Sequence, residues 1–254
     1  MEKVLMRFLG QDSRSKAVPN HKQGNYRNMV RSATTKGTRV AKKPAARSSS
    51  DNTRDKILDA AEYLFGERTF DTVSLRDITQ HAGVTLALAS YHFGTKDRLY
   101  AEIVERRAEL LNDMRRARLA KIEAEGRVTT ETILDAFMHP LFEQMTTGSE
   151  GWQSYMYILS KLAQTNRWLD LLRENFDQTS ELFLSRLAKT LPDVKRPVLM
   201  RGFALALVAM LQTVSKNRRI DALSGGTVSA DDLDAAYETL LKFVVRGLEG
   251  LKEL

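Results

Sequence analysis

Apolar residues recur at helical spacing along most of this 254-residue chain. A first run from Ile57 to Phe65 follows a period of about 3.6 residues, and similar runs continue from Asp97 onward. No alternation of apolar and polar residues persists long enough to indicate a strand, and no internal repeat is visible. The sequence therefore predicts an all-α fold. Beyond Asp97 the expected helices cover residues 97–124, 129–147, 150–165, 168–190, 197–219 and 229–250.

The composition excludes several kinds of catalytic and metal site. The chain has no cysteine, which rules out disulfides, thiolate metal ligands and a cysteine nucleophile. Its four histidines are not spaced as metal ligands, and no Ser/His/Asp set, phosphate-binding glycine loop or paired-carboxylate motif stands out. We therefore expect no enzyme, no metal and no cofactor. Turnover of a small molecule without DNA would favour an enzyme instead.

Positive charge is concentrated at the N-terminus. Residues 1–53 contain twelve Lys or Arg against three acids, a net charge of +9, whereas the remainder carries −2. Residues 1–52 also lack apolar periodicity, so we expect a disordered basic arm. It can be a simple tail, a mis-assigned start with Met29 as the initiator, or an arm that holds phosphates without selectivity. In the last case the chain could be a protein that coats nucleic acid non-specifically.

Residues 53–97 contain residues that typically begin and end helices, at positions that predict three short helices. Thr53 and Ser74 are suitable N-caps for the first and second helices. The second helix stops at Gly83, where a residue with a Cβ would find the backbone conformation costly. A third helix, Leu86–Phe93, follows at once. Two short helices across such a turn predict a helix-turn-helix.

Two stretches of this region, Phe70–Val84 and Ser90–Leu99, resemble the TetR family of bacterial repressors in residue order and spacing. The sequence Tyr-His-Phe-Gly-Thr-Lys, which starts at Tyr91, also resembles the corresponding sequence in a branch of this family that includes fatty-acid-responsive regulators. The resemblance implies a cytoplasmic, nucleoid-associated homodimer that binds a near-palindromic DNA operator. It further implies a helical body, residues 98–254, that binds an effector and dimerises. A hydrophobic small molecule in that body would release a repressor from DNA.

The same resemblance assigns roles to the third helix and its neighbours. It implies that Ala89 and Phe93 face the core of the head. The implied DNA-binding residues are Ser74, Arg76, Thr85, Leu86, Ala87, Leu88, Ser90, Tyr91, His92 and Lys96. Arg76 can pair with a guanine edge, and His92 and Lys96 match positions that hold phosphates. Arg76 can instead be a solvated charge, Tyr91 a packing residue and His92 an exposed imidazole.

The apolar character of the third helix limits direct base reading. Leu86, Ala87 and Leu88 stand where relatives often carry Lys, Gly or Thr, so few hydrogen-bond donors remain. Contacts to thymine methyl groups and DNA shape would then supply specificity together with Arg76.

The segment Val198–Leu211 is apolar on every side and therefore needs to be covered. Its fourteen positions are fewer than the roughly 18–20 of a membrane span, so we expect a core helix and no membrane partner. The last helix carries an apolar stripe from Leu233 to Leu248. By resemblance, the last two long helices would form the homodimer interface. The alternative is that both complete the core of a single chain.

Large apolar side chains cluster in the middle helices, where His139-Pro140 is expected to interrupt a helix. A broken helix beside flexible side chains often borders a cavity, which would suit an apolar or amphipathic effector. Such clusters more often form a core, which is the alternative here. The candidate pocket residues are Phe137, Met138, His139, Phe142, Trp152, Tyr155, Met156, Phe176, Phe203, Leu207 and Met210.

Overall fold

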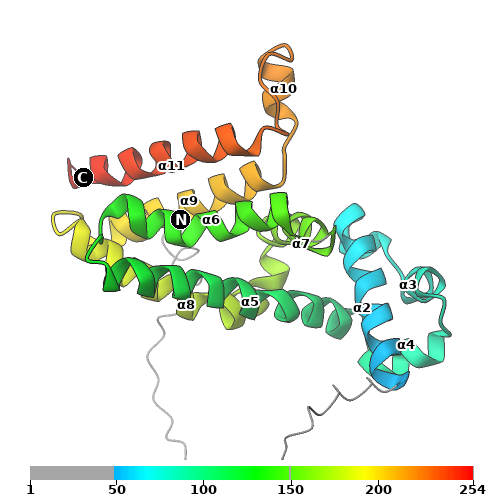
Figure 1. The fold of residues 1–254 in the computed structure, drawn as a ribbon. Helices are drawn as coiled ribbons and strands as arrows, with labels where there is room; N and C mark the ends of the chain where they lie inside the picture. The colour runs from blue at the N-terminus through cyan, green and yellow to red at the C-terminus, as the bar shows by residue number, and fades with distance from the viewer. Residues whose placement is uncertain (1–48, 149, 254) are drawn as a thin grey trace, which may run out of the picture. The chain divides into compact units, whose positions relative to one another are not determined.

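The computed structural model describes residues 49–148 and 150–253, and these residues form helices without any strand (Figure 1). The predicted all-α fold is thus confirmed. The predicted arm lies almost wholly outside the described residues. The elements are α2 (Ser49–Glu67), η1 (Phe70–Thr72), α3 (Leu75–Ala82), α4 (Leu86–Phe93), α5 (Lys96–Ala124), α6 (Thr130–Thr147), α7 (Glu150–Leu162), η2 (Asn166–Trp168), α8 (Leu169–Thr190), α9 (Arg196–Val214), α10 (Arg219–Leu223), α11 (Leu233–Glu249) and η3 (Gly250–Glu253).

Helices α2, α3 and α4 form the head. Ile57, Phe65 and Ile78 are fully buried there, together with Ala89 and Phe93 of α4, as the sequence predicted. These side chains fix α3 and α4 on α2 and leave the opposite face of α4 free.

The first helix begins earlier than predicted. Thr53 was expected as its N-cap, but α2 starts at Ser49, so residues 49–52 are helical rather than part of the arm. Asp51 lies in the first turn, where its carboxylate interacts favourably with the helix dipole. This favourable position extends the helix by one turn.

The core of the head continues into the body. It includes Leu99 and Ile103 of α5 and also Ile158 and Leu162 of α7. The predicted boundary at residue 97 falls near the start of α5, a single helix that runs from Lys96 to Ala124. Helix α5 therefore contributes its first turns to the head and the rest of its length to the body.

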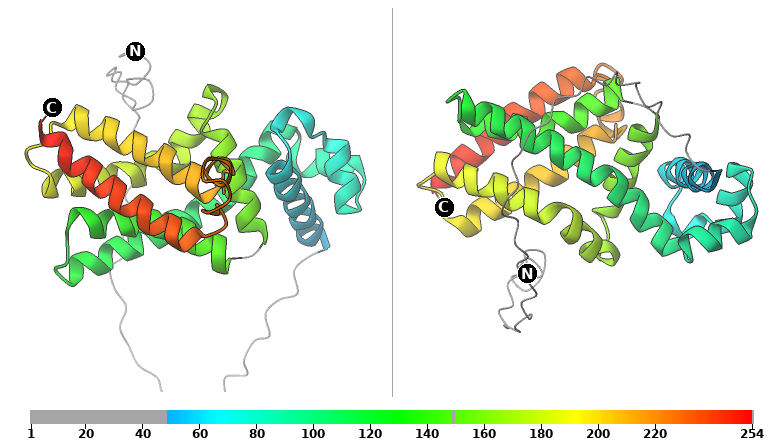
Figure 2. Two further views of the ribbon diagram at one scale, coloured as in Figure 1. Left: turned by 90° about the horizontal axis from the view of Figure 1, so that it is seen from above. Right: turned by 60° about the horizontal axis from the view of Figure 1, so that its bottom comes forward.

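Helices α9 and α11 run side by side in opposite directions, and α10 lies at the turn between them (Figures 1 and 2). Gly202 permits this close approach, because a Cβ there would lie 2.5 Å from Leu248 and 2.6 Å from Leu251.

The break predicted at His139-Pro140 is wrong, because α6 is continuous through Pro140. Proline removes one backbone N–H from a helix, and tertiary packing can outweigh this loss. Pro140 is buried, and the nearby carbonyl of Phe137 accepts a 2.9 Å hydrogen bond from Arg115 Nε.

The helix predicted over 197–219 ends at Val214 instead. Lys216 adopts a left-handed backbone with φ of 53°, which an α-helix does not accommodate. The chain then forms the separate helix α10, which two hydrogen bonds tie to the following loop: Arg218 donates to Asp231 at 2.8 Å, and the Ala230 N–H donates to Asp221 at 3.2 Å.

Candidate functional site

The outer face of α4 is uncovered along its length. Leu86 is 45% exposed, Tyr91 is 80% exposed, and Thr85, Ala87, Leu88 and Ser90 are exposed as well. The predicted readers of DNA thus lie on one solvent-facing surface, opposite the buried Ala89 and Phe93. Their contacts with DNA stay a prediction.

A capping box holds the start of α3. Ser74 Oγ accepts from the Asp77 backbone N–H at 3.1 Å, and the Asp77 carboxylate accepts from the Ser74 hydroxyl at 2.7 Å. These bonds lower the pKa of Asp77. The hydroxyl of Ser74 is therefore engaged in the cap, while the side chain of Arg76 is exposed to solvent. Gly83 ends α3 with φ of 66°, the left-handed turn that the sequence predicted.

Lys96 is directed toward the head's own backbone. Its Nζ donates to the carbonyls of Phe70 and Val73, both at 2.9 Å, and lies 4.2 Å from the centre of the Phe70 ring. An ammonium with two carbonyl partners and an aromatic face has little capacity left for phosphate. The geometry favours Lys96 as a residue that fastens the loop before α3 to α5, rather than as the predicted phosphate ligand.

Replacing Lys96 with Met is expected to lower the free energy of unfolding by about 2 kcal/mol, because hydrogen bonds from a charged donor are lost. The salt dependence of DNA binding should stay unchanged. Urea denaturation and salt titration measure these two effects. Lys56→Met, at an exposed position of α2, is the matched control. A stable Lys96 variant whose salt slope falls by about one unit would restore the phosphate role.

His92 is half-buried, and its ring stands edge-on to Tyr91 with 5.1 Å between ring centroids. His81 of α3 is exposed and stacks on Tyr63 of α2, with 5.1 Å between the ring centroids. Of these residues, Tyr91 and His92 lie at the end of α4 and extend its exposed face.

Two cationic side chains of the body bind the head, and neither contact was predicted from the sequence. Lys161 of α7 donates to the carbonyls of Phe65, Gly66 and Arg68, where α2 ends. Lys161 thereby supplies hydrogen bonds to carbonyl groups at the end of α2 that have no partner within the helix. Burial lowers the pKa of Lys161. Arg167 of η2 pairs with Asp71 at 3.1 Å and with Asp97 at 3.0 Å.

A buried ion pair makes the third link. Arg107 of α5 binds the carboxylate of Glu62 on α2 with two nitrogens, and both side chains are almost fully buried. The guanidinium also lies 4.9 Å from the ring centre of Trp152 on α7. A Cβ on Gly151 would collide with this arginine, so glycine leaves the space for it.

Comparison with known protein families decides the classification. Residues 57–103 match the model of bacterial regulatory proteins of the tetR family, and residues 135–247 match that of the Tetracyclin repressor-like C-terminal domain. The chain belongs to the TetR family of bacterial transcriptional regulators. This is a non-enzymatic family of DNA-binding proteins, as the sequence predicted.

Two curated TetR-type relatives align with part of the chain. The HTH-type transcriptional regulator BetI of Agrobacterium fabrum is 30% identical over 138 residues, which are 53% of this chain and 64% of the relative. An uncharacterized HTH-type transcriptional regulator of Haemophilus influenzae is 30% identical over 84 residues, 33% of this chain and 41% of the relative. The chain thus spans less than two thirds of either relative.

Solved TetR-type structures share the fold over a longer span. A TetR-like regulator from Rhodococcus sp. RHA1 has a TM-score of 0.53 at 20% identity, covering 78% of this chain and 96% of that one. A regulator from Aquifex aeolicus VF5 has a TM-score of 0.50 at 21% identity, covering 76% and 97%. The described helices therefore have the architecture of this family.

The candidate pocket residues of the TetR-type body pack against one another. The Phe137 ring lies 5.0 Å from Phe183 and 5.2 Å from Phe203, and Trp152 lies 5.7 Å from Tyr155. The buried members are Phe137, Met138, Phe142, Trp152, Tyr155, Met156, Phe203 and Met210, and the half-buried members are His139, Phe176 and Leu207. Here they form the core of the body, and their contact with an effector stays a prediction.

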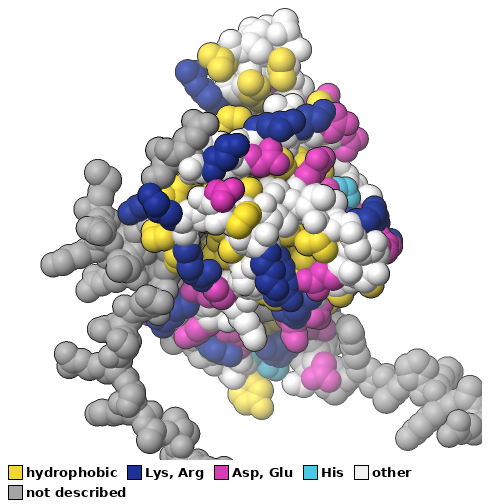
Figure 3. Space-filling model, turned by 90° about the vertical axis from the view of Figure 1, so that its left-hand side faces the viewer, with side chains coloured by type: hydrophobic (Ala, Val, Ile, Leu, Met, Phe, Trp, Pro, Cys, Tyr) yellow, Lys and Arg dark blue, Asp and Glu magenta, His cyan; other side chains and the backbone are white. Residues whose placement is uncertain are grey.

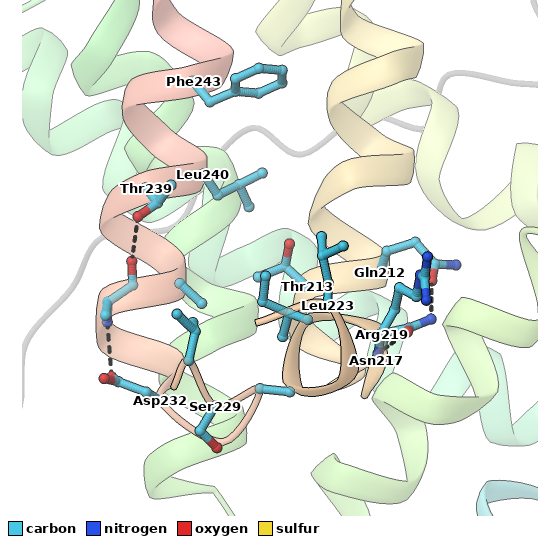
Figure 4. Close-up of a pocket in the computed structure, with 15 residues that line it drawn as sticks. Gln212, Thr213, Asn217, Arg219, Leu223, Ser229, Asp232, Thr239, Leu240 and Phe243 are labelled. Atoms are coloured by element: carbon cyan, nitrogen blue, oxygen red, sulfur yellow. Dashed lines mark hydrogen bonds between the residues drawn. The ribbon is translucent and has the colours of Figure 1, made fainter. Parts of the chain in front are cut away.

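An open pocket of about 730 Å³ lies elsewhere, between α9, α10 and α11 (Figure 4). Its walls are mostly apolar and include Leu223 of α10 and Leu240 and Phe243 of α11. In Figure 4, Phe243 extends from α11 into the space beside α9. None of the predicted pocket residues lines this space.

The surface around this pocket is unusually apolar. Leu205 and Phe243 are each 71% exposed, and Val208 and Leu223 are also exposed. Figure 3 shows further hydrophobic side chains on the projecting α10 segment, whereas charges of both signs are interspersed over the rest of that view. The predicted stripe of α11 is mostly buried within the chain, whereas Leu205 and Val208 of the predicted apolar segment of α9, together with Phe243 of α11, stay exposed as a second apolar face.

Proposed function

We propose that this TetR-family protein binds a near-palindromic operator as a homodimer and is a repressor that an amphipathic small molecule releases from DNA. The exposed face of α4, held on the buried core of the head, is the observation that carries the proposal. The expected place of action is the bacterial cytoplasm.

The geometry of α4 suits the major groove. The groove is roughly 12 Å wide, which admits one helix with short or apolar side chains. Leu86, Ala87 and Leu88 offer methyl groups to thymine, while Ser90 and Tyr91 offer hydroxyls. No acidic residue lies on α4 to repel phosphate. Arg76, exposed on α3, is the proposed reader of a guanine edge.

The exposed apolar face supports the homodimer. Helix α9 is long and apolar enough to cross a membrane by length and composition alone, yet only 28% of its most apolar stretch is buried within the chain. A soluble chain rarely leaves such a surface uncovered. A second copy that brings the same face would bury Leu205, Val208 and Phe243 and give the two-fold symmetry of a palindromic site.

The links between head and body support the release by an effector. A ligand shifts the operator equilibrium if it favours a position of the heads that DNA rejects. Helix α7 carries Trp152, Tyr155 and Met156 into the core and ends near Lys161, which holds α2. Displacement of α7 by a ligand in that core would therefore move the head.

Selection of bound sequences from random duplex DNA tests the proposal directly. The purified protein should enrich a two-fold symmetric site, and amphipathic compounds should then be screened for release of that site. A variant without residues 1–48 is the control, because loss of the arm should weaken all sequences alike. Enrichment of no sequence would refute the function as an operator-binding regulator.

Replacing Arg76 with Ala is expected to weaken operator binding by about 1–3 kcal/mol and to relax the preference at one base pair. Binding to the selected site and to random DNA measures the effect. Arg173→Ala on α8, whose side chain pairs with Asp170 at 3.1 Å, is the control. Equal losses on both DNAs would show that Arg76 contacts phosphate rather than a base.

A further inference from the structure

Arg115 of α5 lies in the centre of the body and is 3% exposed. Its Nε donates to the Phe137 carbonyl at 2.9 Å, and its guanidinium carbon lies 3.9 Å from the centre of the Phe137 ring. Among residues 49–148 and 150–253, no carboxylate pairs with this side chain, and its two terminal nitrogens donate to no acceptor. The positive charge of Arg115 is thus buried without a counter-ion from the described chain.

Other arginines of the same helix are paired with acids. Arg107, two turns earlier and largely buried, donates hydrogen bonds from two nitrogens to the Glu62 carboxylate. Arg118 donates to Glu143 at 2.9 Å, and Arg116 donates to Asp113 at 2.5 Å. A buried charge without a partner is costly, so such residues are rare unless they pair with something. Burial lowers the pKa of Arg115 to about 9, which still leaves it protonated at neutral pH.

A second polar group nearby is also incompletely paired. Asn112, one turn before Arg115, is buried and donates to the Asn175 carbonyl at 2.7 Å, but its Oδ1 accepts no hydrogen bond in the described structure. The neighbours of Arg115 include the aromatic side chains of Phe137 and Tyr155. Two polar groups among apolar side chains thus have unused hydrogen-bonding capacity, which suits the polar end of an amphipathic ligand.

We propose that the effector is an organic anion whose carboxylate pairs with Arg115 while its apolar part lies among the aromatic residues of the core. This inference rests on the proposed effector-controlled function and names the chemical class of the ligand. Arginine binds a carboxylate through two parallel N–H donors, and Nη1 and Nη2 of Arg115 donate to no acceptor among the described residues. The competing role is structural, in which Arg115 supports α6 beside Pro140.

The test measures thermal stability and ligand affinity of the full-length protein with octanoate and 4-phenylbutyrate. Octan-1-ol and octyltrimethylammonium are the uncharged and cationic counterparts. The carboxylates should raise the melting temperature of the wild type by a few degrees, as ligands of the folded state do, and the counterparts should not. Arg115→Met should keep the melting temperature of the free protein, or raise it, and should weaken carboxylate binding about tenfold or more. Arg118→Met should bind as the wild type does.

Several results would overturn the inference. These are equal binding of octanoate and octan-1-ol, no stabilisation of the wild type by either carboxylate, or unchanged affinity in Arg115→Met. If Arg115→Met does not fold, the structural role is indicated, and Arg115→Lys then decides, since a retained charge should retain part of the carboxylate response. The selection of bound sequences from random DNA separates this inference from the proposed function. A protein that enriches one DNA sequence but binds no carboxylate would refute the class of ligand and leave the function as an operator-binding regulator intact.

Discussion

Replacing Phe243 and Val208 together with Asp is expected to convert the proposed homodimer to a monomer. Both side chains are exposed, and the antiparallel pairing of α9 and α11 brings them to the same apolar face. Two carboxylates in each copy would place charge in an apolar interface, and the apolar burial of both side chains would be lost as well. Analytical ultracentrifugation measures the oligomeric state.

The same double variant should bind the complete operator about 10²–10⁴ times more weakly, because the second half-site no longer benefits from a linked head. Affinity for an isolated half-site should not change. Leu110→Asp, at an exposed apolar position of α5, is the control and should remain dimeric. A double variant that stays dimeric would locate the interface elsewhere. Loss of vesicle binding, with no change in mass, would instead indicate a membrane as the occupant of this face.

The sequence predicted the head in detail because its signals are local. Ser74 and Gly83 determine where α3 begins and ends through bonds and dihedral angles within a few residues. Helical periodicity in turn predicted that Ala89 and Phe93 face inward. Features of this kind depend on neighbours along the chain and can be read without knowledge of the tertiary fold.

The links between head and body were not predictable in this way. Lys161 contacts carbonyls more than ninety residues earlier in the chain, and Arg107 contacts Glu62 over a separation of 45 residues. On an amphipathic helix these side chains resemble any solvated charge. Lys96 illustrates the same limit, because the family pattern implies a phosphate ligand while the fold supplies two closer acceptors.

The helices of the body were predicted from the sequence, but which of their apolar side chains are exposed was not. The apolar stripe of α11, with Leu240 in it, was predicted and is mostly buried, but the exposed ring of Phe243 lies outside that stripe and was not predicted. The break at Pro140 failed for a related reason, since burial against neighbouring helices outweighs the loss of one backbone hydrogen bond. Such outcomes depend on which helices meet.

Replacing Glu62 with Gln is expected to destabilise the protein by about 3–5 kcal/mol, because Arg107 would keep a buried charge without its counter-ion. Glu62 is 2% exposed, and its carboxylate accepts from Arg107 Nη2 at 2.6 Å. The Glu62–Arg107 pair joins α2 to α5 beside α7. Its loss should therefore lower the stability of the head as well as that of the whole protein. Urea denaturation followed by circular dichroism gives the free energy of unfolding.

A double-mutant cycle separates the value of the pair from the cost of breaking it. Glu62→Met with Arg107→Met removes both charges and should be far less destabilising than either single change, since no unpaired ion remains. Arg106→Met with Asp59→Ala provides an exposed reference pair, bonded at 2.7 Å, where each change should cost about 1 kcal/mol or less. If the double variant folds but no longer couples effector to operator, the ion pair transmits movement of the body to the head. If its induction is normal, Lys161 and Arg167 are sufficient for that coupling, and the buried pair serves stability alone.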